Sequence, residues 1–380
     1  MGEGNVTITE RRRQTRNKMY RYIYDSRTPV SKQQLAKDMG YSLPTVQQNI
    51  AELLSAGLIR PGEIQKQTGG RPAVGYTVEE GIRYSIGISV SSTNLRILAT
   101  NILQDELAYK KVRIPVFEEN RVGRQIADEL EIFLEEQKIP SEKILGVGLT
   151  FPGVVDREKD TIVLSPTMRM KNISLSDVRE LIPYPVFIEN DSTSGGNAEW
   201  FGLSPEERTE NFVYLFLENG IGGAVFINGH PYLGSEGRSG EFGHMCLQPE
   251  GRLCYCGEKG CLEAYCSAYR FTRDLGISAE EFFAGLEEGN AAYKALWEEI
   301  LDYLAIAVNN LRMAFDCNVI LGGFVSGYIE SYLPVLREKA AALSPFDTDG
   351  SYIRLGRYPI KAGMMGVAWH FTKQFIDEIL

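Results

Sequence analysis

Apolar and polar positions alternate at helical spacing through the first 60 residues. The stretch 15–26 predicts one helix, and a second, shorter helix is expected to end at Gly40, because glycine accepts the left-handed backbone of a helix C-terminus. Ser42 can cap the next helix, which Gly57 ends. The apolar face of that helix is formed by Val46, Ile50, Leu53 and Leu54. Two short helices joined by a glycine-containing turn, after a third helix, are typical of a helix-turn-helix.

The residues that follow predict a β wing. Segments 58–63 and 76–78 are strand-like and flank Gly69-Gly70-Arg71-Pro72. Arginine on a flexible tip is drawn to a narrow minor groove, so Arg71 is a predicted DNA contact. The polar face of the preceding helix offers predicted contacts to base edges, namely Thr45, Gln47, Gln48 and Asn49. A winged helix that binds protein, or a plain linker, is the alternative interpretation.

Residues 81–380 alternate predicted strands and helices. Three strands are expected in an antiparallel meander, then a long helix and a further strand, and a similar order begins again near residue 212. The predicted segments are 84–90, 95–101, 106–114, 121–137 and 144–150, and then 212–217, 223–228, 291–315 and 319–321. This pattern predicts two α/β lobes with a cleft between them.

Length and charge divide the chain further. A chain of 380 residues is too long for one core. We assign 1–80 to a winged helix-turn-helix head, 81–193 with about 362–380 to a first lobe, and 194–361 to a second lobe. The head holds 12 Lys and Arg against 8 Asp and Glu, whereas the remainder holds 28 against 42. A mildly basic head permits contact with nucleic acid without establishing it.

Composition is typical of a globular protein, with 43% hydrophobic and 24% charged residues. No apolar run approaches the roughly twenty residues that span a bilayer. The polar start of the chain also lacks the apolar core of a signal peptide. We therefore expect a cytoplasmic protein without membrane insertion.

Three thiols and one imidazole are spaced for metal binding. His244 precedes Cys254, Cys256 and Cys261, and glycines at 257 and 260 permit a tight knuckle. This donor set suits tetrahedral Zn²⁺, and four protein ligands leave no open coordination position, which predicts a structural ion. The alternative is that these residues are ordinary buried cysteines. That interpretation applies to the remaining three, Cys246, Cys266 and Cys317.

The spacing Glu-x-Gly-His, nine residues, Cys-x-Cys-Gly-x-x-Gly-Cys-x-Glu over 241–263 resembles the signature of the ROK family (repressors, open reading frames, sugar kinases). The resemblance implies that the two lobes form the ribonuclease-H-like body of actin and sugar kinases. Together with the Ile-Glu-Asn-Asp segment at 188–191, it implies that five side chains lie beside a sugar: Asn190, Asp191, Glu241, His244 and Glu263. The family's kinases use that aspartate as general base. Solvated surface charges are the alternative for the two glutamates.

Two loops depart from the pattern of the family's kinases. Those kinases begin the first lobe with Gly-Ile-Asp-Ile-Gly-Gly-Thr, whereas here Ser89 replaces the acid that helps to hold Mg²⁺, and Ser91 and Ser92 replace glycines. Glu218 replaces the first glycine of a second phosphate loop, Gly-Thr-Gly-Ile-Gly-Gly, where its carboxylate repels phosphate. Because phosphoryl transfer depends on electrostatic stabilisation, we predict no ATP chemistry, no catalytic residue and only a vestigial base at Asp191.

These observations predict a sugar-responsive transcriptional regulator, a repressor of carbohydrate genes, with a kinase-like body as sensor. Its expected partners are double-stranded operator DNA with an inverted repeat, a small-molecule sugar or sugar phosphate, and a second copy of the chain in a homodimer. Two alternatives stay open. One is an ATP-dependent sugar kinase, and the other is a regulator that answers a protein partner instead of a sugar.

Overall fold

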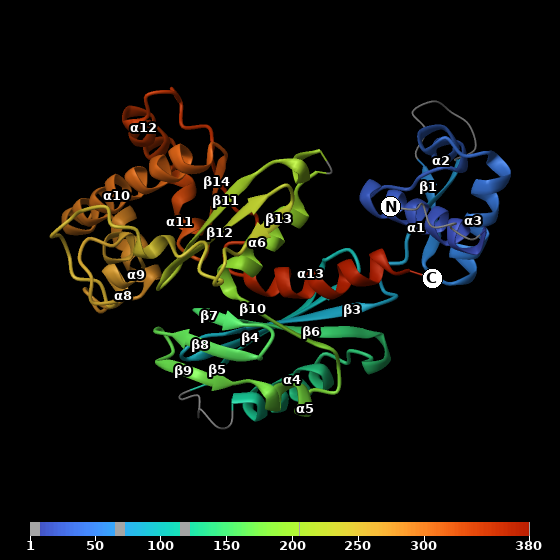
Figure 1. Cartoon of the computed structure of the whole chain (residues 1–380), viewed down its shortest axis with the longest axis horizontal. Helices are drawn as coiled ribbons and strands as arrows, with labels where there is room; N and C mark the ends of the chain where they lie inside the picture. Colours follow the sequence, from blue (N-terminus) through green and yellow to red (C-terminus); the bar gives the residue numbers. More distant parts are fainter. Residues whose placement is uncertain (1–7, 65–72, 115–121, 205, 380) are drawn as a thin grey trace.

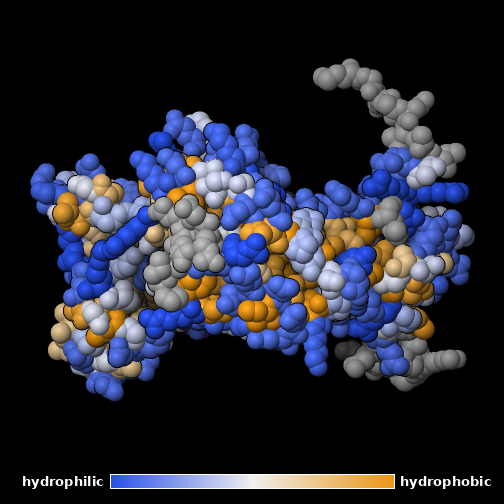
Figure 2. Space-filling model, turned by 90° about the horizontal axis from the view of Figure 1, so that it is seen from below, coloured by the Kyte–Doolittle hydropathy of each residue, from blue (hydrophilic) through white to orange (hydrophobic). Residues whose placement is uncertain are grey.

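The molecule has a small helical unit at its N-terminal end and two larger lobes, each built on one main sheet (Figure 1). The computed structural model describes residues 8–64, 73–114, 122–204 and 206–379. Among these residues, no helix has the length and apolar character that crossing a membrane requires. Seen from below, apolar side chains gather in the middle of a largely polar face (Figure 2).

The N-terminal unit consists of α1 (Ile8–Ser26), α2 (Lys32–Met39), α3 (Leu43–Ser55), β1 (Ile59–Ile64) and β2 (Ala73–Val78). As predicted, α2 ends at Gly40, whose φ is +69°, and Ser42 caps α3 by accepting a hydrogen bond from Thr45 N (3.3 Å). Helix α1 begins earlier than expected, because its first residues are polar helix formers without an apolar period. Strands β1 and β2 pair antiparallel. The predicted wing tip, Arg71, lies outside the described residues.

The first lobe has a five-stranded sheet in the order β10-β6-β3-β4-β5. Its strands are β3 (Tyr84–Val90), β4 (Asn94–Asn101), β5 (Glu106–Arg113), β6 (Ile144–Phe151) and β10 (Val186–Asn190). The first three form the predicted antiparallel meander, whereas β6 and β10 join in parallel. Helices α4 (Val122–Glu136) and α5 (Ser176–Leu181) cover one face. A small antiparallel sheet that we did not predict contains β7 (Val154–Asp156), β8 (Thr161–Ser165) and β9 (Met170–Ser174).

The second lobe repeats this strand order. Its sheet runs β13-β12-β11-β14-β15, again with antiparallel pairs followed by parallel ones. Its strands are β11 (Phe212–Leu217), β12 (Ile221–Ile227), β13 (His230–Tyr232), β14 (Asn318–Gly322) and β15 (Ile353–Leu355). Its helices are α7 (Leu262–Cys266), α8 (Tyr269–Thr272), α9 (Ala279–Glu287), α10 (Ala291–Phe315), α11 (Ser326–Ile329) and α12 (Leu333–Leu343). The repeated order confirms the prediction of two related α/β lobes.

Two helices, α6 (Asp191–Gly202) and α13 (Ala362–Asp377), lie between the lobes (Figure 1). They pack on each other, and α13 lies on β3 and β6 whereas α6 lies on β11 and β12. The close approach of the two helices depends on Gly366, where a Cβ atom would lie 1.8 Å from Ser194 O. Helix α13 therefore covers the first sheet, although it comes last in the chain.

The N-terminal unit rests on this pair of helices. Its core is continuous with Phe201 of α6 and Trp369 of α13, whose ring centroids lie 3.9 Å apart. Tyr24 stacks on Trp369 at 6.4 Å, and Arg21 forms an ion pair with Asp377 at the end of α13. The unit is thus packed against the boundary between the lobes.

Candidate functional site

A cleft of about 320 Å³ lies where the two lobes meet. Its lining includes Ser89, Ser91, Ser92, Arg96, Thr167, Asn190 and Asp191 from the first part of the chain, and Glu218, Glu241, His244, Tyr255 and Glu263 from the second. Residues that are widely separated in sequence therefore share one cavity. All five residues that the family resemblance assigned to a sugar site are among them.

Asn190 caps helix α6 and positions Asp191. Its Oδ1 accepts a hydrogen bond from Thr193 N (2.9 Å), and its Nδ2 donates to Gly153 O (2.8 Å) in the Pro-Gly turn. The amide is thus engaged within the chain, so this residue orients the cleft wall. Asp191 Oδ1 accepts a hydrogen bond from Ser192 N (2.8 Å), and the residue lines the cleft.

Asp191 and Glu218 both line the cleft, and both carboxyl groups have a raised pKa. Burial and then the charge of Glu218 raise the pKa of Asp191 to about 8. Burial also raises the pKa of Glu218 to about 7, against the opposing charge of Arg96. Glu218 Oε1 accepts a hydrogen bond from Phe324 N (3.2 Å), which fixes the carboxyl group beside the cavity. The two groups therefore hold part of their protons at neutral pH.

Glu263 presents a free oxygen to the cavity from helix α7. Only 3% of the residue is exposed, and its Oε2 accepts a hydrogen bond from Ile221 N (3.0 Å), whereas its Oε1 is buried and has no partner among the residues that the structure describes. Burial raises its pKa to about 7. Tyr255 Oη lies 3.4 Å from His244 Nε2 and 3.5 Å from Glu263 Oε2. Since buried polar atoms are nearly always bonded, the free oxygen marks a place for a ligand hydroxyl.

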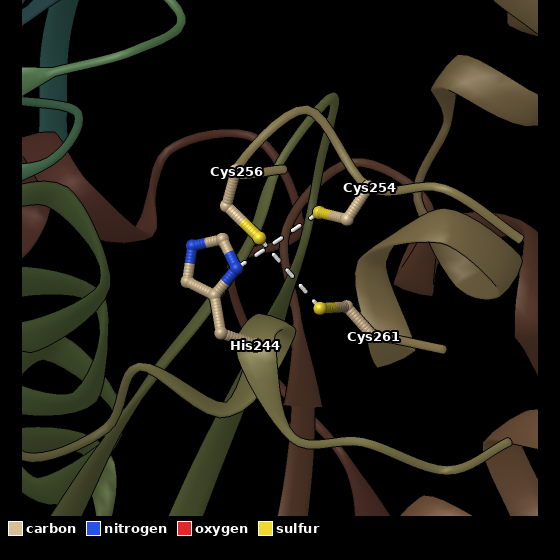
Figure 3. A group of neighbouring side chains, drawn as sticks. All are labelled: His244, Cys254, Cys256 and Cys261. Atoms are coloured by element: carbon tan, nitrogen blue, oxygen red, sulfur yellow. Dashed lines mark hydrogen bonds between the residues drawn. The ribbon is translucent and has the colours of Figure 1, made fainter. Parts of the chain in front are cut away.

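The side chains of His244, Cys254, Cys256 and Cys261 converge beside this wall (Figure 3). Their ligand atoms all lie within 4.8 Å of one another. Cys256 Sγ and Cys261 Sγ are 3.8 Å apart, and His244 Nδ1 lies 4.0 Å from Cys254 Sγ. Two thiolates on a tetrahedral ion with metal–sulfur bonds of about 2.3 Å are separated by about 3.8 Å. The cluster can therefore hold a metal ion.

The local sequence explains why these ligands meet. A 3-10 turn ends at His244, and Cys261 occupies the N-cap position of α7. Gly260 between them has a φ of +82°, and a Cβ atom there would lie 2.0 Å from Gln248 O. Of the other cysteines, Cys266 and Cys317 are buried as expected. The expectation was wrong for Cys246, which is exposed and whose Sγ lies 3.7 Å from Lys259 O.

The polar face of α3 differs in part from the predicted one. Gln47 and Gln48 are exposed and Thr45 is half-buried, but Asn49 is only 7% exposed and its Nδ2 donates to Thr45 O (2.8 Å). Positions 46, 49, 50 and 53 share one side of a helix, so Asn49 lies on the side that faces the core. It stabilises α3 from within and does not belong to the exposed face.

Among the cleft residues that were not predicted from the sequence are three polar ones, Arg96, Thr167 and Tyr255. Arg96 faces the cavity because β4 pairs Arg96 with Ser89 of β3, and its Nε is buried without a partner in the described part of the chain. Thr167 follows β8, and its Oγ1 also lacks a hydrogen-bond partner within the described ranges. Tyr255 lies between Cys254 and Cys256 in the chain, and no sequence signal distinguishes it from a spacer residue of the metal motif. The predicted antiparallel pairing of the first strands could have placed Arg96 beside Ser89. No sequence pattern predicted the turn that carries Thr167.

Comparison with known proteins agrees with this geometry. The ROK family model matches residues 85–374. The xylose repressor of Bacillus subtilis (strain 168) is 26% identical over 365 residues, which cover 93% of this chain and 92% of that protein. Among solved structures, a ROK family transcriptional regulator described as a homolog of the E. coli MLC protein has a TM-score of 0.75 with 22% identity and covers 97% of both chains. The ROK hexokinase from Thermus thermophilus has a TM-score of 0.58 with 28% identity, covering 76% of this chain and 97% of that one. The chain therefore belongs to the ROK family.

Proposed function

We propose that this protein is a sugar-responsive transcriptional repressor of carbohydrate genes, in which the N-terminal unit binds DNA and the interlobe cleft binds a sugar. The observation that carries the proposal is a helical unit with an exposed polar helix, packed directly on the two helices that separate the lobes of a kinase-like body. Similarity to a xylose repressor along nearly the whole chain supports it.

The N-terminal unit fits a winged helix-turn-helix. In this assignment α2 and α3 are the two helices of the motif, and β1 with β2 forms the wing. Gln47 and Gln48 on α3 are the proposed contacts to base edges, with Thr45 beside them. Arg71 is the further proposed DNA contact, from the segment between the two strands. We assign residues 1–80 to this domain.

The body is divided at the two central helices. We assign 81–193 with about 362–380 to the first lobe and 194–361 to the second, because α13 returns to the first sheet and α6 leaves it. Asn190 and Asp191 stand at that boundary, whereas Glu241, His244 and Glu263 belong to the second lobe. A sugar held by both sets would draw the lobes together.

The cleft does not suit phosphoryl transfer, and we propose that the protein is not an enzyme. A half-buried carboxyl group at Glu218 and hydroxyls at Ser89, Ser91 and Ser92 line the end where the family's kinases would bind phosphate and Mg²⁺. Asp191 then serves as a hydrogen-bond acceptor for the sugar. The similarity to a hexokinase keeps an ATP-dependent sugar kinase as the second candidate.

We propose zinc as the ion of the cysteine cluster. Three sulfur ligands and one nitrogen ligand are the set that structural Zn²⁺ sites use, and no coordination position remains for substrate. His244 Nδ1 faces the cluster while its Nε2 faces Tyr255 and the cleft. The ion would therefore fix the imidazole that forms part of the proposed sugar site.

A homodimer in the cytoplasm completes the proposal. One helix-turn-helix reads only a few base pairs, so two heads are needed for a useful affinity, and a twofold dimer predicts an inverted-repeat operator. The apolar side chains on the face in Figure 2 are consistent with a protein contact through the body.

Two measurements test the function. Selection from a random duplex library should enrich one inverted repeat, and binding to that duplex should weaken when a sugar that raises the melting temperature is added. Loss of sequence preference at physiological salt would contradict a specific repressor. Sugar-dependent ADP release that disappears in Asp191→Asn would favour the kinase. If no sugar raises the melting temperature of the protein, a protein partner would be favoured as the effector.

A further inference from the structure

The positive charge of the N-terminal unit is concentrated in its first helix. Helix α1 holds six basic residues against two acidic ones, whereas the rest of residues 1–80 holds six of each kind. The excess of basic residues in the head therefore lies entirely on α1. Its basic residues are Arg11, Arg12, Arg13, Arg16, Lys18 and Arg21.

The body neutralises charges only in the C-terminal half of α1. Arg21 forms its ion pair with Asp377, and Asp25 forms one with Arg208 at 3.5 Å. Towards the other end, Glu10 is the only carboxylate among residues 8–18. Four exposed cations there have no ion pair in the part of the chain that the structure describes: Arg11, Arg12, Arg13 and Lys18. Since like charges one helical turn apart repel each other, this end of α1 favours an anionic partner.

An ion pair places this end of α1 beside α3. Arg16 Nη1 donates a hydrogen bond to Glu52 Oε2 (2.7 Å), and Glu52 Oε1 accepts another from Gln48 Nε2 (3.2 Å). Glu52 thus joins α1 to the exposed polar face of α3, which carries the proposed base contacts. Arg12 and Arg13 precede Arg16 by four and three residues, so they lie on the same side of α1, one turn closer to its beginning.

We propose that the N-terminal half of α1 is a second DNA-binding surface, which holds phosphates of the operator backbone beside the groove that α3 enters. Arg12 and Arg13 are its central residues. The inference rests on the proposed DNA-binding function and adds to it a helix for which the sequence predicted no contact. Arginine and phosphate form charge-assisted hydrogen bonds, and phosphate contacts fix the register of a protein on a duplex without reading its sequence. Helix α1 should therefore contribute affinity, whereas α3 contributes sequence preference.

The salt dependence of DNA binding tests this, measured by fluorescence anisotropy on the full-length protein. The duplexes are the inverted repeat enriched by selection and a shuffled sequence of the same length, at salt concentrations between about 50 and 200 mM. Each phosphate contact contributes about 0.9 to the slope of log K against log salt concentration. Arg12→Gln and Arg13→Gln should each make that slope shallower by about 0.9 per bound head, and should weaken binding to both duplexes by the same factor.

A matched control separates this surface from the general charge of the protein. Arg124→Gln, the same change at an exposed position on α4, should leave the slope and the affinity unchanged. Arg12→Lys retains the positive charge and should keep the wild-type slope. Melting temperatures equal to that of the wild type exclude a loss of binding through unfolding.

The outcomes distinguish the inference from the function on which it rests. Wild-type slopes in both glutamine variants would overturn the inference while leaving the repressor proposal intact. A loss of affinity confined to the operator, with an unchanged slope, would assign the arginines to base edges and would also refute it. If the wild type binds both duplexes equally and the glutamine variants still lower the slope, the phosphate surface stands and the sequence-specific repressor fails. If the wild type binds neither duplex, both proposals fail.

Discussion

At the scale of single residues, Asp191 illustrates how surroundings decide what a carboxyl group can do. Its pKa rises from an ordinary value of 3.8 to about 8. Between these values the native state keeps a proton that the unfolded chain releases, so the contribution of Asp191 to stability is largest at low pH and falls as the pH rises towards 8.

Asp191→Asn should remove this pH dependence. We expect the free energy of unfolding of the wild type to decrease more between pH 5 and pH 8.5 than that of the variant, as measured by urea denaturation. Asp128→Asn, an exposed change on α4, is the matched control and should follow the wild type. Parallel curves for the wild type and Asp191→Asn would contradict the raised pKa.

Glu263 should be the most sensitive residue of the proposed sugar site. Replacing it by alanine removes the free acceptor and leaves Ile221 N without a partner. Because hydrogen bonds to charged groups contribute about 1.5–3 kcal/mol, Glu263→Ala should weaken sugar binding by roughly 10- to 150-fold in calorimetry. Glu258→Ala, on the exposed part of the knuckle, should bind normally. Unchanged affinity in Glu263→Ala would remove it from the site.

The sequence motif predicted which residues line the cleft but not what their side chains do there. Asn190 lies at the cleft as expected, yet its amide bonds are made within the chain. Asn49 is polar, and helical spacing nevertheless turns it towards the core. Thr167 depends on a turn whose position is set by tertiary contacts. A motif specifies residue types, whereas hydrogen-bond partners depend on the folded geometry.

At the scale of elements, the knuckle should depend on its metal. Cys256→Ser removes one of four ligands, so purified protein should lose the approximately one Zn²⁺ per chain expected for the wild type. Sugar binding should weaken as well, because His244 loses its fixed orientation. Elemental analysis and calorimetry measure both effects. Wild-type protein purified without chelator and containing no metal would contradict the assignment.

Helix α3 should carry the sequence preference. Gln47 is exposed, and its replacement by alanine should reduce discrimination between operator and altered duplexes by about 1–3 kcal/mol if the side chain contacts a base edge. Fluorescence anisotropy with matched duplexes measures this. Gln137→Ala, an exposed glutamine beyond α4, is the control and should not change discrimination. A uniform loss of affinity on every duplex would assign Gln47 to the phosphate backbone instead.

Elements with strong local signals were predicted closely. The serine cap of α3 and the apolar period of α10 mark their limits, and the three strands of the meander match β3, β4 and β5. The sheet of β7, β8 and β9 was missed because its strands are short and mostly half-buried or exposed. Such strands lack the regular alternation from which a strand is recognised.

At the scale of the whole molecule, the alternation of predicted elements indicated two similar lobes. It did not indicate where the N-terminal unit packs on them. Trp369 packs beneath Tyr24, more than 300 residues away in the chain. No local pattern indicates which partner a buried tryptophan has. Helix α13 also lines the cleft near its beginning, at Gly363 and Met364. One helix therefore connects the cleft to the head.

This connection predicts coupling between sugar and DNA. A sugar that changes the arrangement of the lobes should alter operator affinity by about 5- to 150-fold, the range of a 1–3 kcal/mol coupling. Trp369→Leu should lower that factor below twofold while sugar binding persists, because the contact between α13 and the head is loosened. Phe346→Leu, an exposed aromatic change, should retain the coupling. Operator titrations with and without sugar measure the change in DNA affinity. A change in Trp369→Leu as large as in the wild type would exclude coupling through α13.

Helix α13 also has a consequence for the order in which the protein is made. During synthesis the ribosome releases the head and the strands of the first sheet long before residues 362–377, which cover that sheet and support the head. Until those residues emerge, the apolar faces of β3 and β6 have no cover on that side. The head and the first lobe cannot complete their common core before α13 has been synthesised, since domains fold in the order in which their parts appear. Contacts across so many residues are also slow to form. Synthesis of α13 is thus a condition for assembling the part of the molecule proposed to bind DNA.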